Sequence, residues 1–197
     1  SARTIPRVTL HGFVRSIQST PSFERAMGRA SRDTDFSLVD GARAPLIANL
    51  LAARQAELGA APMLFVLTAT SRETEQFGTD LQTFVPDAHI AEFPAWETLP
   101  HERLSPSVET TGKRLRAMRE LTEWKASERT SPFVLLASVR AALQPLLPGL
   151  DAATTIRLER GSRGNDLSSL ALQLVDLAYS RVDMVTRRGE FAVRGGI

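Results

Sequence analysis

The sequence contains no cysteine, so it cannot form a disulfide, a thiolate metal site or a cysteine nucleophile. This absence fits a reducing compartment, and we expect the protein to be cytoplasmic. No apolar run approaches the roughly 20 residues that a membrane-spanning helix needs. No secretory signal is visible at the start of the chain either. We therefore expect no membrane partner.

Lysine is also scarce, and the charge is almost balanced. The 197 residues include 24 basic and 22 acidic side chains, for a formal net charge of +2. Only Lys113 and Lys125 are lysines, so arginine supplies nearly all of the positive charge. An isolated DNA-binding domain typically has a strongly basic stripe, which this composition does not provide. Composition therefore disfavours a dedicated DNA-binding domain.

Continuous apolar runs indicate the fold class. Met63–Thr68 and Phe133–Ala137 are apolar almost throughout, which is typical of strands buried on both faces. Helical patterns lie between such runs. Strands that alternate with helices predict an α/β domain, in which helices cover both faces of a parallel sheet.

The pattern changes near Pro148 and Gly149, where we place a domain boundary. Residues 1–148 are expected to form the α/β domain, and residues 149–197 to begin an α+β domain. The chain ends at Gly195-Gly196-Ile197 with no helix stop or polar tail. We therefore expect the sequence to be a piece of a longer protein.

Caps and turns locate the other elements. Thr20-Pro21 predicts the start of a helix, and Thr70 with Glu73 matches a capping box for another. The further elements expected are strands at Phe36–Val39, His89–Phe93 and Thr154–Glu159, helices from Pro45, at Ser107–Trp124, Val139–Leu147 and Leu167–Tyr179, and two strands, Val182–Thr186 and Phe191–Val193, joined around Arg188-Gly189.

The segment Asp40–Ala48 lies where a phosphate-binding loop would be, between an expected strand and a helix. Such a loop needs glycines, a lysine for the phosphates and a Ser or Thr for magnesium. Apolar side chains replace the last two groups here, and Pro45 lacks the N–H that would face a phosphate. Arg43 could meet an anion or simply lie exposed in the turn. We predict no nucleotide hydrolysis and no bound cofactor in this chain.

No residue pattern favours a metal site or an enzyme. His11, His89 and His101 are far apart in sequence, without the paired spacing of zinc ligands. The serines lack a nucleophile-elbow motif, and the paired glutamates fall on the outer faces of expected helices. We therefore predict no catalytic residue and no metal.

Two segments are candidates for recognition. The first is the proline-rich loop Phe93–Pro106, which includes Trp96, Glu97, His101 and Arg103. These side chains could contact a partner, or Trp96 could pack beneath the loop and hold it on the sheet. The sequence leaves both readings open.

The second segment is Tyr179–Gly196, which is rich in arginine. Alternation places Phe191 towards the core and Arg194 towards the surface. Arginine is a preferred interface residue because its planar fork pairs with carboxylates in two places at once. A solvated rim is the plainer alternative. The arginines are Arg181, Arg187, Arg188 and Arg194, with Gly189 and Glu190 between them.

Both segments resemble one family. The run Phe93-Pro94-Ala95-Trp96-Glu97-Thr98-Leu99-Pro100 is similar to the N-terminal module of the bacterial transcription-repair coupling factors, the Mfd family. The run from Tyr179-Ser180-Arg181 to Val193-Arg194-Gly195 is similar both to that family and to the excinuclease subunit UvrB. The resemblance covers about Phe36 to Ile197.

The resemblance implies a degenerate RecA-like, UvrB-like domain followed by the start of a UvrA-binding domain. It makes Arg181 and Arg194 candidate contacts with UvrA, with Gly189 and Glu190 beside them, while Ala192 stands where UvrB has another arginine. The parent protein would be an ATP- and magnesium-dependent DNA translocase that displaces stalled RNA polymerase. Three functions remain open: a UvrA-docking module, a nucleotide-dependent DNA-binding domain with a divergent phosphate loop, and an autoinhibitory scaffold.

Overall fold

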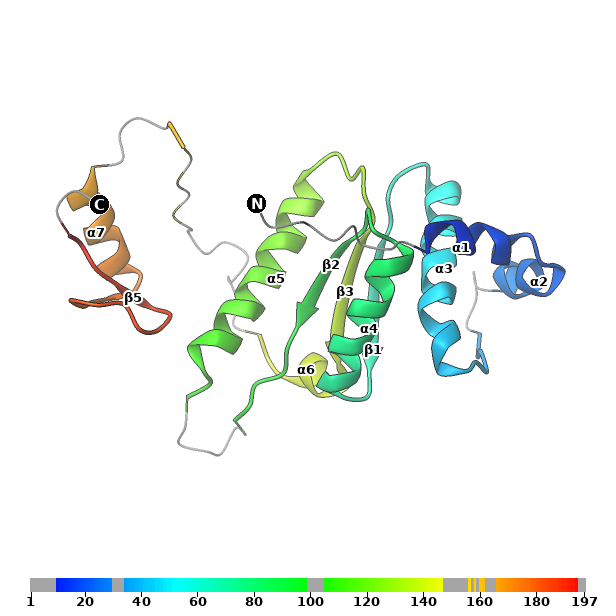
Figure 1. The fold of residues 1–197 in the computed structure, drawn as a ribbon, viewed down its shortest axis with the longest axis horizontal. Helices are drawn as coiled ribbons and strands as arrows, with labels where there is room; N and C mark the ends of the chain where they lie inside the picture. Colours follow the sequence, from blue (N-terminus) through cyan, green and yellow to red (C-terminus); the bar gives the residue numbers. More distant parts are fainter. Residues whose placement is uncertain are drawn as a thin grey trace, which may run out of the picture.

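The computed structural model describes residues 10–29, 34–98, 105–146, 156, 158, 160–161 and 166–194. Three parallel strands form a sheet in the order β1 (Met63–Thr68), β3 (Phe133–Ser138) and β2 (His89–Phe93). Helices cover both faces of this sheet (Figure 1). The predicted α/β class is therefore confirmed.

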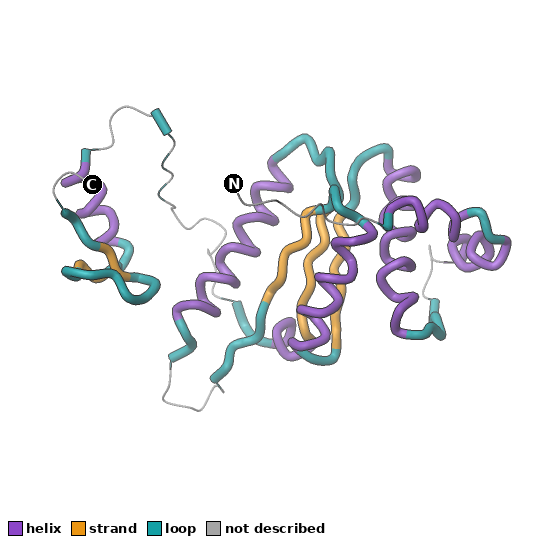
Figure 2. The backbone as a smooth tube through the Cα atoms, in the orientation of Figure 1, coloured by secondary structure: helices purple, strands orange, loops and turns teal. Residues whose placement is uncertain are grey.

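The central strand organises two apolar layers. All six residues of β3 are buried. Because successive side chains of a strand point to opposite faces, they enter both layers. Val134 and Leu136 pack with α3 (Arg43–Leu58) and α4 (Ser71–Phe84). Phe133 and Leu135 face the other way and pack with α5 (Val108–Ala126). Figure 2 shows the three strands between these helices.

The prediction that β1 is buried on both faces is wrong. Met63, Phe65 and Leu67 remain 39%, 49% and 49% exposed. They lie on the same face of the sheet as Phe133, Leu135 and Ala137. On that face α5 packs over β2 and β3 and does not extend across β1. An apolar run therefore identified the strand correctly without showing which of its faces is covered.

The N-terminal helices lie beside α3. α2 (Pro21–Arg29) begins at the predicted proline, whereas α1 (His11–Gln18) was not predicted. α1 packs against α3 and α4, and the Leu10 N–H donates to the Thr83 carbonyl at 2.8 Å. The contacts that hold α1 in place therefore come from residues far along the chain.

The expected strand at Phe36–Val39 is also wrong. Residues 34–39 have no regular secondary structure and lead into η1 (Asp40–Ala42), a 3-10 turn, and then α3. A run of four residues becomes a strand only when a sheet edge pairs with it, and no described strand does so. Val39 is largely exposed instead.

The capping prediction at Thr70 is confirmed, since its hydroxyl accepts the Glu73 N–H at 3.2 Å at the start of α4. The Thr20 hydroxyl instead donates to the Ile17 carbonyl, and Ser107, which was not predicted as a cap, caps α5. α6 (Val139–Leu143) is shorter than expected. It ends before Gln144, which is extended because the next residue, Pro145, disfavours a helical conformation there.

The C-terminal unit contains α7 (Leu167–Asp176), β4 (Ser180–Arg181) and β5 (Glu190–Phe191). The two short strands pair in parallel, so the hairpin-like arrangement expected from Val182–Thr186 and Phe191–Val193 is wrong. Residues 182–189 instead form a loop that returns the chain to the same direction. The predicted boundary at 148 and most of the strand expected at 154–159 lie outside the described residues.

Candidate docking surface

The arginines of the C-terminal unit are presented to solvent. Arg181 lies on β4, Arg187 and Arg188 lie on the loop of residues 182–189, and Arg194 follows β5. All four residues are exposed. All four lie within residues 181–194, a segment that the pairing of β4 with β5 folds back on itself.

Neither Arg181 nor Arg194 is paired with a carboxylate among the described residues. The ion pairs in the described parts of the chain lie elsewhere, on α3, α5 and the turn before α3, and between β2 and α5. Arg194 donates from Nη2 to the Asp183 carbonyl at 2.7 Å, which leaves its other N–H groups available. The surface can therefore accept acidic groups without first breaking an internal salt bridge.

Glu190 is engaged within the unit. Its Oε2 accepts the N–H groups of Thr186 and Arg187 at 2.8 and 3.0 Å, and the Thr186 hydroxyl at 3.1 Å. The two backbone N–H groups hold the pKa of Glu190 below its ordinary value, because they stabilise the charged form. The carboxylate therefore closes the loop that precedes it.

Gly189 makes the turn into β5. Its φ is +85°, in the left-handed region that side chains other than glycine rarely adopt. Its carbonyl accepts the Ser180 N–H at 2.8 Å, which fixes the start of the parallel pairing. Gly189 thus contributes backbone geometry to the surface.

Apolar side chains accompany the arginines. Met184 and Val185 are 69% and 51% exposed near the middle of the loop. A groove of about 940 Å³ separates the unit from the first half of α5. Arg188 reaches across this groove to α5, where its Nη1 would lie 3.8 Å from a Cβ atom added to Gly112. The surface is therefore mixed, with cationic groups around small apolar side chains.

The proline-rich loop is held at its base by its own side chains. The backbone N–H of Trp96 donates to Gln144 Oε1 at 2.7 Å, and the Trp96 ring centre lies 4.2 Å from the Arg114 guanidinium. Arg114 is only 3% exposed, stacks on Phe93 as well, and donates to the Pro94 carbonyl at 2.7 Å. Trp96 is half-buried, so it packs beneath the loop, which was the alternative to direct contact.

Glu97 closes the same loop from the other side. It accepts the Ser107 hydroxyl at 2.5 Å and the Thr110 hydroxyl, at the N-terminus of α5. These two hydroxyls lower the pKa of Glu97 to about 2, which keeps the cap charged. His101 and Arg103 lie outside the described residues. Sequence reasoning missed the cap formed by Glu97 and the burial of Arg114, because contacts across a loop leave no periodic signal.

The turn before α3 does not form a phosphate-binding loop in the described structure. Its N-terminal end lies on the side of the sheet where β1 and β2 end, as a nucleotide site would (Figure 1). Arg43, however, pairs with Asp40 at 2.9 Å, and Pro45 is buried in the first turn of the helix. The only cation of the turn is therefore already paired.

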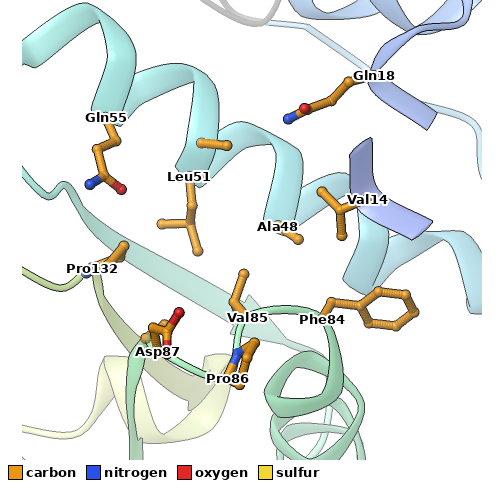
Figure 3. A pocket seen from close by; sticks show the side chains of 12 residues that line it. Val14, Gln18, Ala48, Leu51, Gln55, Phe84, Val85, Pro86, Asp87 and Pro132 are labelled. Atoms are coloured by element: carbon orange, nitrogen blue, oxygen red, sulfur yellow. The ribbon is translucent and has the colours of Figure 1, made fainter. Parts of the chain in front are cut away.

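A small cavity between α1, α3 and the turn after α4 is chiefly apolar (Figure 3). Its volume is about 220 Å³, below the range typical of ligand sites. Gln18, Gln55 and Asp87 are its polar lining residues, and no cationic residue lines it. No cluster of three or more metal-ligating side chains occurs within the described ranges. No helix there is long and apolar enough to cross a membrane.

Residues 156–197 match the family described as the UvrB interaction domain. The transcription-repair-coupling factor of Mycobacterium tuberculosis is 43% identical over 188 residues, which is 94% of this chain and 15% of that protein. The Bacillus subtilis protein of the same name is 29% identical over 136 residues, or 68% of this chain and 11% of the relative.

The chain belongs to the transcription-repair-coupling factor family, as its N-terminal, UvrB-like module. The resemblance stated from the two sequence segments is thereby confirmed. The chain spans about 15% of the length of its mycobacterial relatives.

Proposed function

We propose that this chain is a docking module that recruits UvrA to the parent coupling factor. The observation that supports it is the exposed cluster of Arg181, Arg187, Arg188 and Arg194, on the unit that matches the UvrB interaction domain. Arg181 and Arg194 have no carboxylate partner among the described residues, and this favours a partner with acidic groups, since each guanidinium can donate two N–H groups to one carboxylate. Arg181 and Arg194 are the proposed direct contacts.

We propose further that this module is non-catalytic and binds no nucleotide. The pairing of Arg43 with Asp40 and the buried Pro45 support this against a divergent phosphate loop. ATP and magnesium would then be used by other parts of the parent protein, which would translocate on DNA and displace RNA polymerase in the cytoplasm. Equilibrium titration with a fluorescent ATP analogue and magnesium should show no saturable binding to this chain.

Titration calorimetry of UvrA into the chain tests docking. Wild type should bind, and the double variant Arg181→Glu with Arg194→Glu should lose at least about 2 kcal/mol of binding free energy, because two attractive charges become repulsive. Arg72→Glu is the control for charge reversal away from this surface, and the single variants Arg181→Glu and Arg194→Glu match it in net charge. Arg72 is an exposed arginine of α4, on the opposite layer from α5, and its reversal should leave affinity unchanged.

Equal loss in Arg72→Glu would show a general effect of net charge and would contradict a specific arginine face. A folded wild-type chain that does not bind UvrA would favour the autoinhibitory scaffold instead. That alternative is tested by adding the chain to the remaining domains of the parent and measuring whether their ATP hydrolysis falls.

A further inference from the structure

Glu190 is an acidic residue in the middle of a surface that is expected to meet an acidic partner. A carboxylate at such a position would repel carboxylates on UvrA if it were a direct contact. Its side chain, however, points into its own loop. Among the described residues, its carboxylate accepts three hydrogen bonds, all from Thr186 and Arg187, at 2.8 to 3.1 Å.

The loop of residues 182–189 is closed at both ends. Glu190 holds its second half, and Arg194 holds its first half through the bond to the Asp183 carbonyl at 2.7 Å. Backbone bonds from Ser180 to Gly189 and from Val182 to Phe191, at 2.8 and 2.9 Å, fix the two strands that flank it. Polar contacts thus fix the loop at each end.

Apolar packing does little to order this loop, because Met184 and Val185 are exposed near its middle. An exposed loop without such fixation would sample many conformations, and binding would have to order it. Charge-assisted hydrogen bonds to backbone N–H groups are among the stronger polar contacts available at a surface. Removing Glu190 should therefore release Arg187 and Arg188 from their present positions.

We infer that Glu190 is a positioning residue of the docking surface: its carboxylate shapes residues 182–189 so that Arg187 and Arg188 are presented beside Arg181 and Arg194. This inference rests on the proposed function, because the affinity that it changes is the affinity for UvrA. It assigns direct contact to the arginines and an indirect role to Glu190.

Two variants separate positioning from direct contact. Glu190→Ala removes the acceptor, and UvrA should bind about tenfold more weakly, as expected for the loss of charge-assisted hydrogen bonds. Glu190→Gln keeps an acceptor oxygen but no charge, and should bind within about threefold of wild type. A direct ionic contact would instead make the two variants equally weak, and that result would overturn the inference.

Asp183→Ala is the matched control for charge. Asp183 is exposed on the same loop, and only its backbone carbonyl is used. Its replacement adds the same net positive charge as Glu190→Ala, so it should bind UvrA as tightly as wild type or more tightly. Weakening equal to that of Glu190→Ala would show that loop charge, not Glu190 geometry, sets the affinity.

Amide hydrogen exchange on the free chain completes the test. Thr186 and Arg187 amides should exchange faster in Glu190→Ala than in wild type, while the amides of β3 remain equally protected and show that the variant is folded. If wild type binds UvrA and Glu190→Ala binds equally well, the positioning role fails alone. If wild type does not bind UvrA, the docking function and the positioning role fail together.

Discussion

The α/β domain and the C-terminal unit are stabilised in different ways. The domain surrounds β3, whose six residues are all buried, with helices on both faces. The C-terminal unit has no buried residue in α7, and its strands are two residues long. Hydrogen bonds to the Glu190 carboxylate and from the Arg194 guanidinium hold its loop instead. Polar contacts can order a surface of exposed side chains without burying them.

The largest expected effect tests this contrast by replacing one leucine with alanine in each region. Leu136→Ala, at a residue that is 0% exposed on β3, should lower the free energy of unfolding by about 3 kcal/mol, because it opens a cavity in a closed layer. Leu172→Ala, at a residue that is 67% exposed on α7, should change it by less than about 0.5 kcal/mol. Urea denaturation followed by circular dichroism measures both values. Similar losses would mean that α7 is covered in solution.

Arg114 tests whether a polar side chain can act as a core residue in the α/β domain. Its guanidinium lies between the rings of Phe93 and Trp96, and burial lowers its pKa. Its Nε and Nη2 find no acceptor among the described residues, so its stabilisation comes from stacking and one carbonyl. Arg114→Ala should cost about 2 kcal/mol of unfolding free energy, because packing and cation–π contacts are lost together.

Arg116→Ala, two positions along α5, is the matched control. Arg116 is exposed and should contribute less than about 0.5 kcal/mol to unfolding free energy. The fluorescence of Trp96 should also shift to longer wavelength in Arg114→Ala and not in Arg116→Ala. Denaturant unfolding measures both values, and an unchanged midpoint of unfolding in Arg114→Ala would show that the stacked arrangement adds nothing to stability.

Glu97 supplies the intermediate effect, through pH. Hydrogen bonds from Ser107 and Thr110 lower its pKa from the ordinary 4.5 to about 2. A lowered carboxyl pKa stabilises the fold fully above pH 4.5, and this stabilisation is lost as pH falls towards 2. Because the group is exposed and screened, the loss should be on the order of 1 kcal/mol.

Glu97→Gln should remove that part of the pH dependence. Unfolding free energies of both proteins, measured by denaturant titration between neutral and acidic pH, should converge as Glu97 becomes protonated. Parallel curves at a constant separation would contradict a titrating cap at the base of the proline-rich loop.

Sequence patterns predicted the domain better than the unit, for a physical reason. β1, β2 and β3 were predicted because burial selects apolar runs, and the capping box at Thr70 because local hydrogen bonding selects its residues. Burial of Arg114 could not be predicted, since its position on a helix is compatible with an exposed face. Whether β1 is covered depends on where α5 crosses the sheet, which no local pattern encodes.

In the C-terminal unit, the alternation of Val182–Thr186 resembles a strand, yet those residues form a loop. Ser180 pairs in parallel with Glu190, and the Glu190 carboxylate also accepts the Thr186 N–H within the loop, contacts that no local sequence pattern encodes. The exposure of the four arginines agrees with their charge, because exposed charged residues need no packing partner. Their role as contacts stays a prediction, and the hydrogen bonds of Glu190 to the loop could not be predicted from the sequence.

The smallest expected effect asks whether the two regions unfold together. The Asp166 carboxylate accepts the Ser169 N–H at 3.1 Å and begins α7, so Asp166→Ala should destabilise that helix by about 0.5–1 kcal/mol. If the C-terminal unit opens on its own, amide exchange in α7 should accelerate while β3 amides and the midpoint of global unfolding remain unchanged. An equal loss of protection in β3 would show that the two regions form one cooperative unit. The docking surface would then draw its order from the α/β core as well as from Glu190 and Arg194, and core variants such as Leu136→Ala should weaken UvrA binding in proportion to the stability they remove.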